Sequence, residues 1–251
     1  MKKIKNLKLL YKNDQRGEII FNKSIYLKKN IAKIFKPIIK DRKCFFFIDK
    51  NLYQKMDLRL YCKTLKKELN AEIFLLKGGE QVKSLYYFNN YLNKVFQSGV
   101  NVNSYIVAIG GGTITDMIGF SSSIYMRGVD LFLVPTTLMG QADATTAGKT
   151  CINSLSTKNI IGTYYLPKFV YSNINYLANL PNYEFRQGIS EIFKYGLLGS
   201  KKLITDLEKF TQNNEKKLIS KILKETIRVR ISLRKKNGLI SNLGHTFGHA
   251  F

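Results

Sequence analysis

Short apolar runs alternate with amphipathic stretches through the N-terminal half of the chain. Apolar residues at helical spacing predict a helix over 82–96, and Gly99 is its expected stop. Because strands that alternate with helices pair in parallel through crossover connections, this pattern predicts an α/β nucleotide-binding half. The continuous apolar runs predict buried strands at 45–48, 73–76, 105–109 and 131–134.

The pattern changes past about residue 180, where Leu180-Pro181 interrupts the chain. Long stretches of helical periodicity follow and predict three helices, at about 183–199, 201–212 and 215–235. We therefore expect an α/β domain over residues 1–175 and a mostly α-helical domain over residues 176–251.

The composition is that of a folded globular protein, with 45% hydrophobic and 23% charged residues in 251. No apolar run approaches the roughly 20 residues that span a bilayer. We therefore expect no membrane association. The start, 1–5, is basic, but no 7–15-residue apolar stretch follows it, so we do not expect a secretory signal. Cys44, Cys62 and Cys151 are scattered without metal spacing, which favours a reducing, cytoplasmic location.

The formal net charge of +24 admits two interpretations. Lys and Arg neutralise phosphates, so one interpretation is a nucleic-acid-binding protein. The other is compositional drift, since Lys, Asn, Ile, Tyr and Phe are all abundant and the basic residues are spread along the chain. We favour drift combined with an affinity for small anionic substrates, whose association the surplus charge accelerates.

A glycine run, Gly110-Gly111-Gly112, stands between a predicted strand and a predicted helix. Such glycines let the backbone approach a pyrophosphate, and the helix N-terminus supplies N–H donors. The spacing is not G-x-G-x-x-G, so a plain tight turn remains an alternative. Arg127 and Lys149 are candidate phosphate ligands. Gly148-Lys149-Thr150 resembles the end of a P-loop, but the required earlier glycine is absent, so we reject an ATPase.

Two further pairs carry candidate chemistry in the C-terminal half. Glu191 and Lys194 lie at i, i+3 and share a helix face, where a surface ion pair is the simpler interpretation. The chain's two histidines, His245 and His249, stand one helical turn apart among glycines. Histidines so placed share a metal or divide the roles of ligand and acid/base, and we favour a functional role for them.

Taken together, these blocks resemble the 3-dehydroquinate synthase family from about residue 45 to residue 251. The segments that carry the resemblance are MRG, PTTL, GKT-IN, KN-IG-YY-P, LP--E-R-G--E--KYG and LGHTFGHA. Iron-type alcohol and glycerol dehydrogenases are similar in the glycine run and histidine turn but lack the MRG and GKT blocks. Sister sugar-phosphate cyclases share nearly every block and remain an alternative.

The resemblance implies a Rossmann-like NAD-binding domain followed by a helical domain that carries zinc or cobalt. Glu191 and His245 match two of the three metal ligands. Arg127 matches a residue that enters the neighbouring subunit's pocket, which implies a homodimer. The NAD-binding positions are Asp49, Asn51, Glu80, Lys83, Gly111, Gly112, Asp116, Thr136, Thr137, Asp143 and Lys158. The substrate positions are Arg127, Lys149, Asn159, Lys194, Asn242 and His249, and Lys224 is a weaker match.

The implied enzyme is an NAD- and metal-dependent lyase of the shikimate pathway. It converts 3-deoxy-D-arabino-heptulosonate 7-phosphate, a phosphorylated sugar acid, to 3-dehydroquinate and phosphate. NAD oxidises a ring alcohol, phosphate leaves by elimination, the hydride returns, and an aldol closure forms the carbocycle. Because NAD is regenerated in each turnover, no net oxidation or reduction results.

The sequence departs from the family in two places. The family's chain continues past the position of Phe251, and that stretch carries the third zinc ligand and another substrate lysine. A glutamate and a substrate-binding arginine are expected where this chain has Arg234 and Gly238. Three hypotheses follow: a working or split synthase, an inactive relative that still binds NAD, or a nucleic-acid-binding protein on the same fold. We also expect the missing part to leave an apolar face exposed, with dimerisation or poor solubility as the result.

Overall fold

The computed structural model describes residues 7–10, 16–22, 27–155, 157–213, 216–236 and 243. Seven strands form one sheet in the order β1-β2-β9-β6-β5-β3-β4. All neighbours from β2 to β4 pair in parallel, and β1 adds an antiparallel edge. The strands are β1 (Leu7–Leu10), β2 (Arg16–Asn22), β3 (Cys44–Asp49), β4 (Glu72–Leu76), β5 (Tyr105–Gly110), β6 (Asp130–Pro135) and β9 (Phe169–Asn173).

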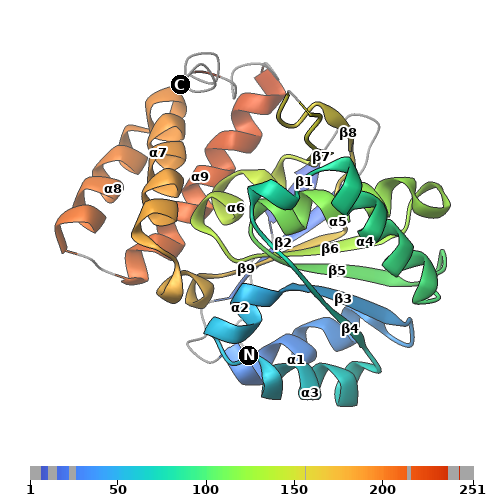
Figure 1. Ribbon diagram of the computed structural model, residues 1–251. Coiled ribbons are helices and arrows are strands. Elements are labelled where there is room, and N and C mark those ends of the chain that lie inside the picture. Colours follow the sequence, from blue (N-terminus) through green and yellow to red (C-terminus); the bar gives the residue numbers. More distant parts are fainter. Residues whose placement is uncertain are drawn as a thin grey trace.

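Helices connect and cover these strands, as the alternating pattern predicts (Figure 1). The four strands and the parallel pairing expected from the sequence are confirmed. The helix expected over 82–96 begins at Leu85, because Glu80–Val82 forms a separate 3-10 turn after Gly79, whose φ is 103°. The helices of this part are α1 (Leu27–Ile39), α2 (Lys50–Lys55), α3 (Arg59–Leu69), α4 (Leu85–Gln97), α5 (Gly112–Ile124) and α6 (Leu138–Ala142).

The three C-terminal helices are also confirmed, as α7 (Asn182–Gly199), α8 (Lys201–Asn213) and α9 (Lys216–Lys236). They pack on one another beside the sheet, on the left in Figure 1. A two-stranded antiparallel hairpin, β7 (Lys149–Ile152) and β8 (Ile161–Tyr164), stands apart from the main sheet. None of the described helices is both long and apolar enough to cross a membrane.

The strands read as continuous apolar runs because both faces of the sheet are buried. Phe45 and Phe47 point into one buried cluster, whereas Phe46 and Ile48 point into the other. This is the period of two that a strand imposes on its side chains. The second cluster packs α1 and α3 against the sheet, and the first packs α4, α5 and the C-terminal helices.

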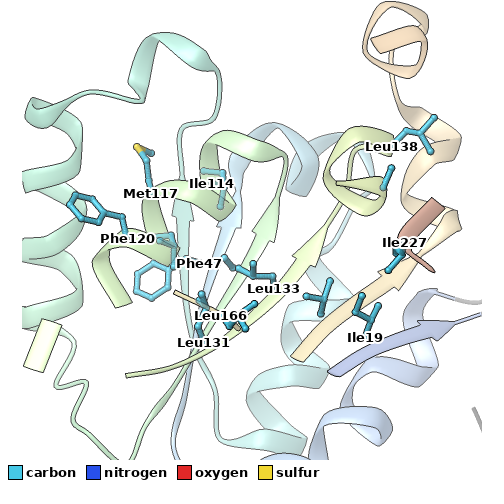
Figure 2. Close-up of a cluster of buried hydrophobic side chains, with 14 of the residues drawn as sticks. Ile19, Phe47, Ile114, Met117, Phe120, Leu131, Leu133, Leu138, Leu166 and Ile227 are labelled. Atoms are coloured by element: carbon cyan, nitrogen blue, oxygen red, sulfur yellow. The ribbon is translucent and has the colours of Figure 1, made fainter. Parts of the chain in front are cut away.

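The first cluster extends from the sheet into the helical part (Figure 2). Leu133 of β6, Leu138 of α6 and Ile227 of α9 belong to it and are almost completely buried. The α/β part and α7–α9 therefore share a continuous core, which fixes the C-terminal helices beside the strand ends. The expected domain boundary near residue 175 stays a prediction.

Candidate functional site

A cleft of about 590 Å³ lies where the parallel strands end. Asp49 ends β3, Gly110 ends β5, and Pro135 ends β6. The chain connections diverge between β3 and β5, and ligands of such sheets bind at the carboxyl ends beside that point. The opposite wall includes Tyr183 and Gln187 of α7. The cleft thus lies between the sheet and the helical part.

Eight of the eleven residues that the resemblance assigns to NAD line this cleft. Lys83, Asp116 and Asp143 do not line it, and each forms a buried or partly buried ion pair nearby. The eight lining residues are Asp49, Asn51, Glu80, Gly111, Gly112, Thr136, Thr137 and Lys158.

The glycine run forms the turn from β5 into α5 at the floor of the cleft. Gly111 occupies the N-cap position of α5, so the first N–H groups of that helix face outward without intrahelical partners. A Cβ on Gly111 would lie 3.1 Å from Thr137 Cγ2, whereas one on Gly112 would meet nothing within 4 Å. The backbone is therefore accessible to a pyrophosphate group, and the helix dipole favours negative charge there.

The other two strand ends are fixed by helix capping. The carboxylate of Asp49 accepts hydrogen bonds from the backbone N–H groups of Asn51, at 2.8 Å, and Leu52, at 3.3 Å. The hydroxyl of Thr137 accepts from the N–H of Gly140 at 3.1 Å and caps α6. These caps hold the polar groups at the cleft mouth in place, as expected for Asp and Thr at an N-cap.

Lys83 forms a buried polar cluster behind the cleft. Its ammonium donates to Asp116 Oδ2 at 2.6 Å and to Asn159 Oδ1 at 2.5 Å, and the side chain is only 5% exposed. Burial lowers the pKa of Lys83, but the charge and hydrogen bond of Asp116, together with Cys151 and Glu80, outweigh it, so the net shift is upward. The thiol of Cys151 donates to Asn159 Oδ1 at 3.3 Å, and burial raises the pKa of this thiol to about 11.

The loop of the β7–β8 hairpin is fastened to this cluster. The amide of Asn153 donates to Glu80 Oε1 at 2.8 Å, and its own oxygen accepts from the N–H of Asn159 at 2.8 Å. One hairpin with its loop therefore carries the predicted substrate residues Asn159 and Lys149 and the predicted cofactor residue Lys158, of which Lys158 lines the cleft. All three side chains are exposed.

Glu191 and Lys194 share one face of α7, as their spacing predicts. Both side chains are 13% exposed, so the pair is more buried than an ordinary surface ion pair, and the ammonium donates to Glu191 Oε1. Gly188 lets α7 approach α6 closely, because a Cβ there would lie 2.5 Å from Leu138 Cβ. This contact sets the depth of α7, and thus of Glu191, beside the strand ends.

Asp143 is held from the helical side. Its Oδ1 accepts the hydroxyl of Tyr195 at 2.6 Å and the Nε of Arg230 at 2.5 Å. Burial raises the pKa of Asp143, but the charge and hydrogen bond of Arg230, the Tyr195 hydrogen bond and the charge of Lys194 together outweigh it and hold the pKa below its usual range. The sequence did not single out Arg230, because it lies among several basic residues on an amphipathic helix.

Other predicted residues lie elsewhere. Lys224 lines a second cleft, of about 210 Å³, whose described lining residues come from α8 and α9 and are all different from those of the first cleft. Arg127 is exposed in the turn after α5, and its φ of 63° follows a φ of 48° at Met126. Asn242, His245 and His249 lie outside the described residues.

The described residues include one predicted metal ligand, Glu191. They contain no group of three or more His, Cys, Asp or Glu side chains placed to hold a metal. The described part of the site thus fits a dinucleotide, through its glycine turn and its cleft, and leaves the metal expected from the resemblance untested.

Comparisons with known proteins agree with this arrangement. A family model described as 3-dehydroquinate synthase N-terminal matches residues 73–187. The 3-dehydroquinate synthase of Sulfurisphaera tokodaii is 36% identical over 222 residues, which cover 84% of this chain and 61% of that protein. The 3-dehydroquinate synthase of Helicobacter pylori strain G27 is 34% identical over 237 residues, which cover 90% of this chain and 67% of that protein. The chain thus spans about 61% to 67% of the curated relatives' length.

Solved structures share the fold. A 2-deoxy-scyllo-inosose synthase, complexed with carbaglucose-6-phosphate, NAD+ and Co2+, matches with a TM-score of 0.80 and 23% identity, over 98% of this chain and 69% of that one. The 2-epi-5-epi-valiolone synthase of Streptomyces hygroscopicus subsp. jinggangensis 5008, with NAD+ and Zn2+ bound, matches with a TM-score of 0.81 and 22% identity. That match covers 92% of this chain and 66% of that one. At these identities the matches show the fold alone.

Proposed function

The chain belongs to the 3-dehydroquinate synthase family, and we propose that it takes part in the reaction of that family. The reaction converts 3-deoxy-D-arabino-heptulosonate 7-phosphate to 3-dehydroquinate and phosphate. The observation that carries the proposal is the strand-end cleft, whose lining contains the glycine turn and eight predicted cofactor residues. The chain spans about 61% of the length of the Sulfurisphaera tokodaii enzyme.

The cleft is proposed to bind NAD, which supplies a reversible hydride acceptor for a ring alcohol. The N–H groups at the start of α5 would hold its pyrophosphate beside Gly111 and Gly112. Asp49 stands at the end of β3, where a carboxylate accepts hydrogen bonds from ribose hydroxyls. Lys83 and Asp116 would act from behind the cleft wall, since each is already paired with the other.

The substrate side is proposed to lie between the β7–β8 hairpin and α7. Loss of phosphate places negative charge on its oxygens, and fixed cations lower the barrier to that loss. Lys149 at the start of β7 and Lys194 on α7 supply such cations from two elements. Zinc or cobalt is proposed to bind Glu191 together with His245, and a bound divalent cation would polarise the alcohol oxygen.

A homodimer is also part of the proposal. Arg127 is exposed, and within the described residues its side chain forms no ion pair. The resemblance assigns this arginine to the neighbouring subunit's pocket. Sedimentation equilibrium tests it: a dimer is expected, and a monomer at concentrations of catalytic assays would contradict it.

Phosphate release from the heptulosonate phosphate, with NAD and Zn2+ or Co2+ present, tests the proposed reaction. Release that is lost with chelator, in Glu191→Ala and in Lys149→Ala, is the expected result. Lys43→Ala is the matched control, because Lys43 precedes β3 at the opposite end of the strands. Release from a hexose 6-phosphate instead would identify a sister cyclase, and NAD binding without any release would identify an inactive relative.

A further inference from the structure

Arg230 is a buried arginine of α9 that reaches the strand-end part of the site. Its side chain is 6% exposed, and its Nε donates to Asp143 Oδ1. Its Nη1 donates to the carbonyl oxygen of Thr146 at 2.8 Å. Burial of a guanidinium is costly unless its donors are satisfied, so the contacts with Asp143 and Thr146 make this one orientation strongly preferred.

A second arginine extends the same contact. Arg234, one turn further along α9, donates from Nη1 to the carbonyl oxygen of Ala147 at 2.7 Å. Asp143, Thr146 and Ala147 belong to one turn, and Lys149 follows it at the start of β7. Through these contacts, α9 packs against the short segment that joins Asp143, a predicted cofactor residue, to Lys149, a predicted phosphate-binding residue.

The geometry at Asp143 leaves one oxygen for another partner. Tyr195 and Arg230 both donate to Oδ1. Within the described residues Oδ2 accepts no hydrogen bond, and the side chain keeps 25% exposure. The charged groups that act on this carboxylate are Arg230 from α9 and Lys194 from α7. The Asp143 carboxylate is therefore oriented through Oδ1, while Oδ2 remains able to accept a hydrogen bond from a ligand, which is the arrangement of a pre-organised contact.

We propose that Arg230 is a positioning residue, which fixes Asp143 and the turn before Lys149 for a phosphorylated polyol ligand. The inference rests on the proposed function for the identity of that ligand. It goes beyond the resemblance, which assigns no role to Arg230. If Arg230 only held α9 against the turn, its replacement would weaken binding of the phosphorylated ligand no more than binding of NAD.

Equilibrium binding separates these two roles. The Kd values of the heptulosonate phosphate and of NAD are measured by calorimetry for Arg230→Gln, Arg230→Lys and the unsubstituted chain. We expect Arg230→Gln to weaken binding of the phosphorylated ligand by about tenfold, because Asp143 loses the charged hydrogen bond that orients it. Although the resemblance assigns Asp143 to NAD, this residue does not line the strand-end cleft proposed for NAD, so the Kd of NAD should stay within about twofold. Arg230→Lys should recover part of the loss.

A matched control is available in α3. Arg59 Nε lies 2.7 Å from Asp57 Oδ1, the same pair of atoms, but its side chain is 75% exposed. Arg59→Gln should change neither Kd by more than about twofold. Asp143→Asn combined with Arg230→Gln should weaken ligand binding no further than Asp143→Asn alone, because the two residues act as a unit. Equal losses for both ligands, or losses that multiply in the double variant, would overturn the inference.

A signal of the contact itself keeps this test separate from the proposed function. In protein labelled with 15N-arginine, the Arg230 Nε–H should exchange slowly and should shift in Asp143→Asn but not in Asp57→Asn. An Arg230 signal that is unchanged by Asp143→Asn would refute the positioning role whatever the ligand. Absence of phosphate release from the unsubstituted chain would instead count against the proposed reaction.

Discussion

Replacement of Lys83 by methionine tests the buried ion pair behind the cleft. Lys83 is 5% exposed, and its partner Asp116, at 2.6 Å, is 17% exposed. Removal of one member of a buried pair leaves the other charge uncompensated and costs about 3–5 kcal/mol. Because Asp116 keeps some exposure, we expect the lower end, about 3 kcal/mol of unfolding free energy. That loss corresponds to a fall in Tm of about 6–12 °C for a chain of this size.

An exposed pair provides the comparison. Lys43 pairs with Glu72, but their side chains are 45% and 40% exposed. Solvent screening keeps the worth of such a pair small, so Lys43→Met should change the unfolding free energy by no more than about 1 kcal/mol. Both variants keep the unbranched aliphatic part of the lysine, so the difference between them reports the charge and its burial.

Urea unfolding at pH 7, followed by circular dichroism without NAD, measures both values. The double variant Lys83→Met, Asp116→Asn removes the uncompensated charge and should recover at least about 1 kcal/mol of the loss. A cost of Lys83→Met no greater than that of Lys43→Met, or a double variant less stable than Lys83→Met alone, would refute a stabilising buried pair.

Gly188→Ala should destabilise the chain by about 1–2 kcal/mol through overpacking against Leu138, and Leu138→Ala in the same chain should relieve part of that cost in urea unfolding. The pKa of Asp143 is lower in the folded chain than its unfolded value of 3.8, so ionised Asp143 stabilises the fold above that pH. This stability is lost as pH falls through the folded pKa. The urea midpoint should therefore fall more between about pH 5 and pH 3 in the unsubstituted chain than in Arg230→Gln, and an equal fall in both would contradict this prediction. Because the pKa of Cys151 is about 11, its thiolate is rare at pH 8, and Cys151 should react with iodoacetamide on the order of 100-fold more slowly in the folded chain than in the unfolded chain. Equal rates for Cys151 in the two states, measured by mass spectrometry, would refute this.

The sheet was predictable from sequence because its strands are buried on both faces. The runs at Phe45–Ile48 and Tyr105–Ile109 are continuously apolar, and a crossover helix follows each pattern. The start of α4 was misplaced by three residues, since apolar spacing alone cannot distinguish a 3-10 turn at Glu80–Val82 from the first turn of a helix.

Local pattern indicated the placement of the candidate residues that follow strands and of the Glu191–Lys194 pair on one helix face. Asp49 ends β3 and Gly111 follows β5, so local pattern and topology place them at the strand ends, whereas the assignment of Asp49 to NAD came from the resemblance. The contact between Arg230 and Asp143 spans 87 residues and depends on how α9 packs, which no local pattern encodes. Lys224 illustrates the same limit, because its cleft is formed by the pairing of α8 with α9.

The most direct test of the account is to follow phosphate and NADH together in one reaction. The sample contains the chain, NAD, Zn2+ or Co2+, and 3-deoxy-D-arabino-heptulosonate 7-phosphate. A cyclase regenerates its NAD in every turnover, so the account predicts continuous phosphate release without accumulation of absorbance at about 340 nm. Accumulation of NADH without phosphate would show a dehydrogenase on this fold and would contradict the account.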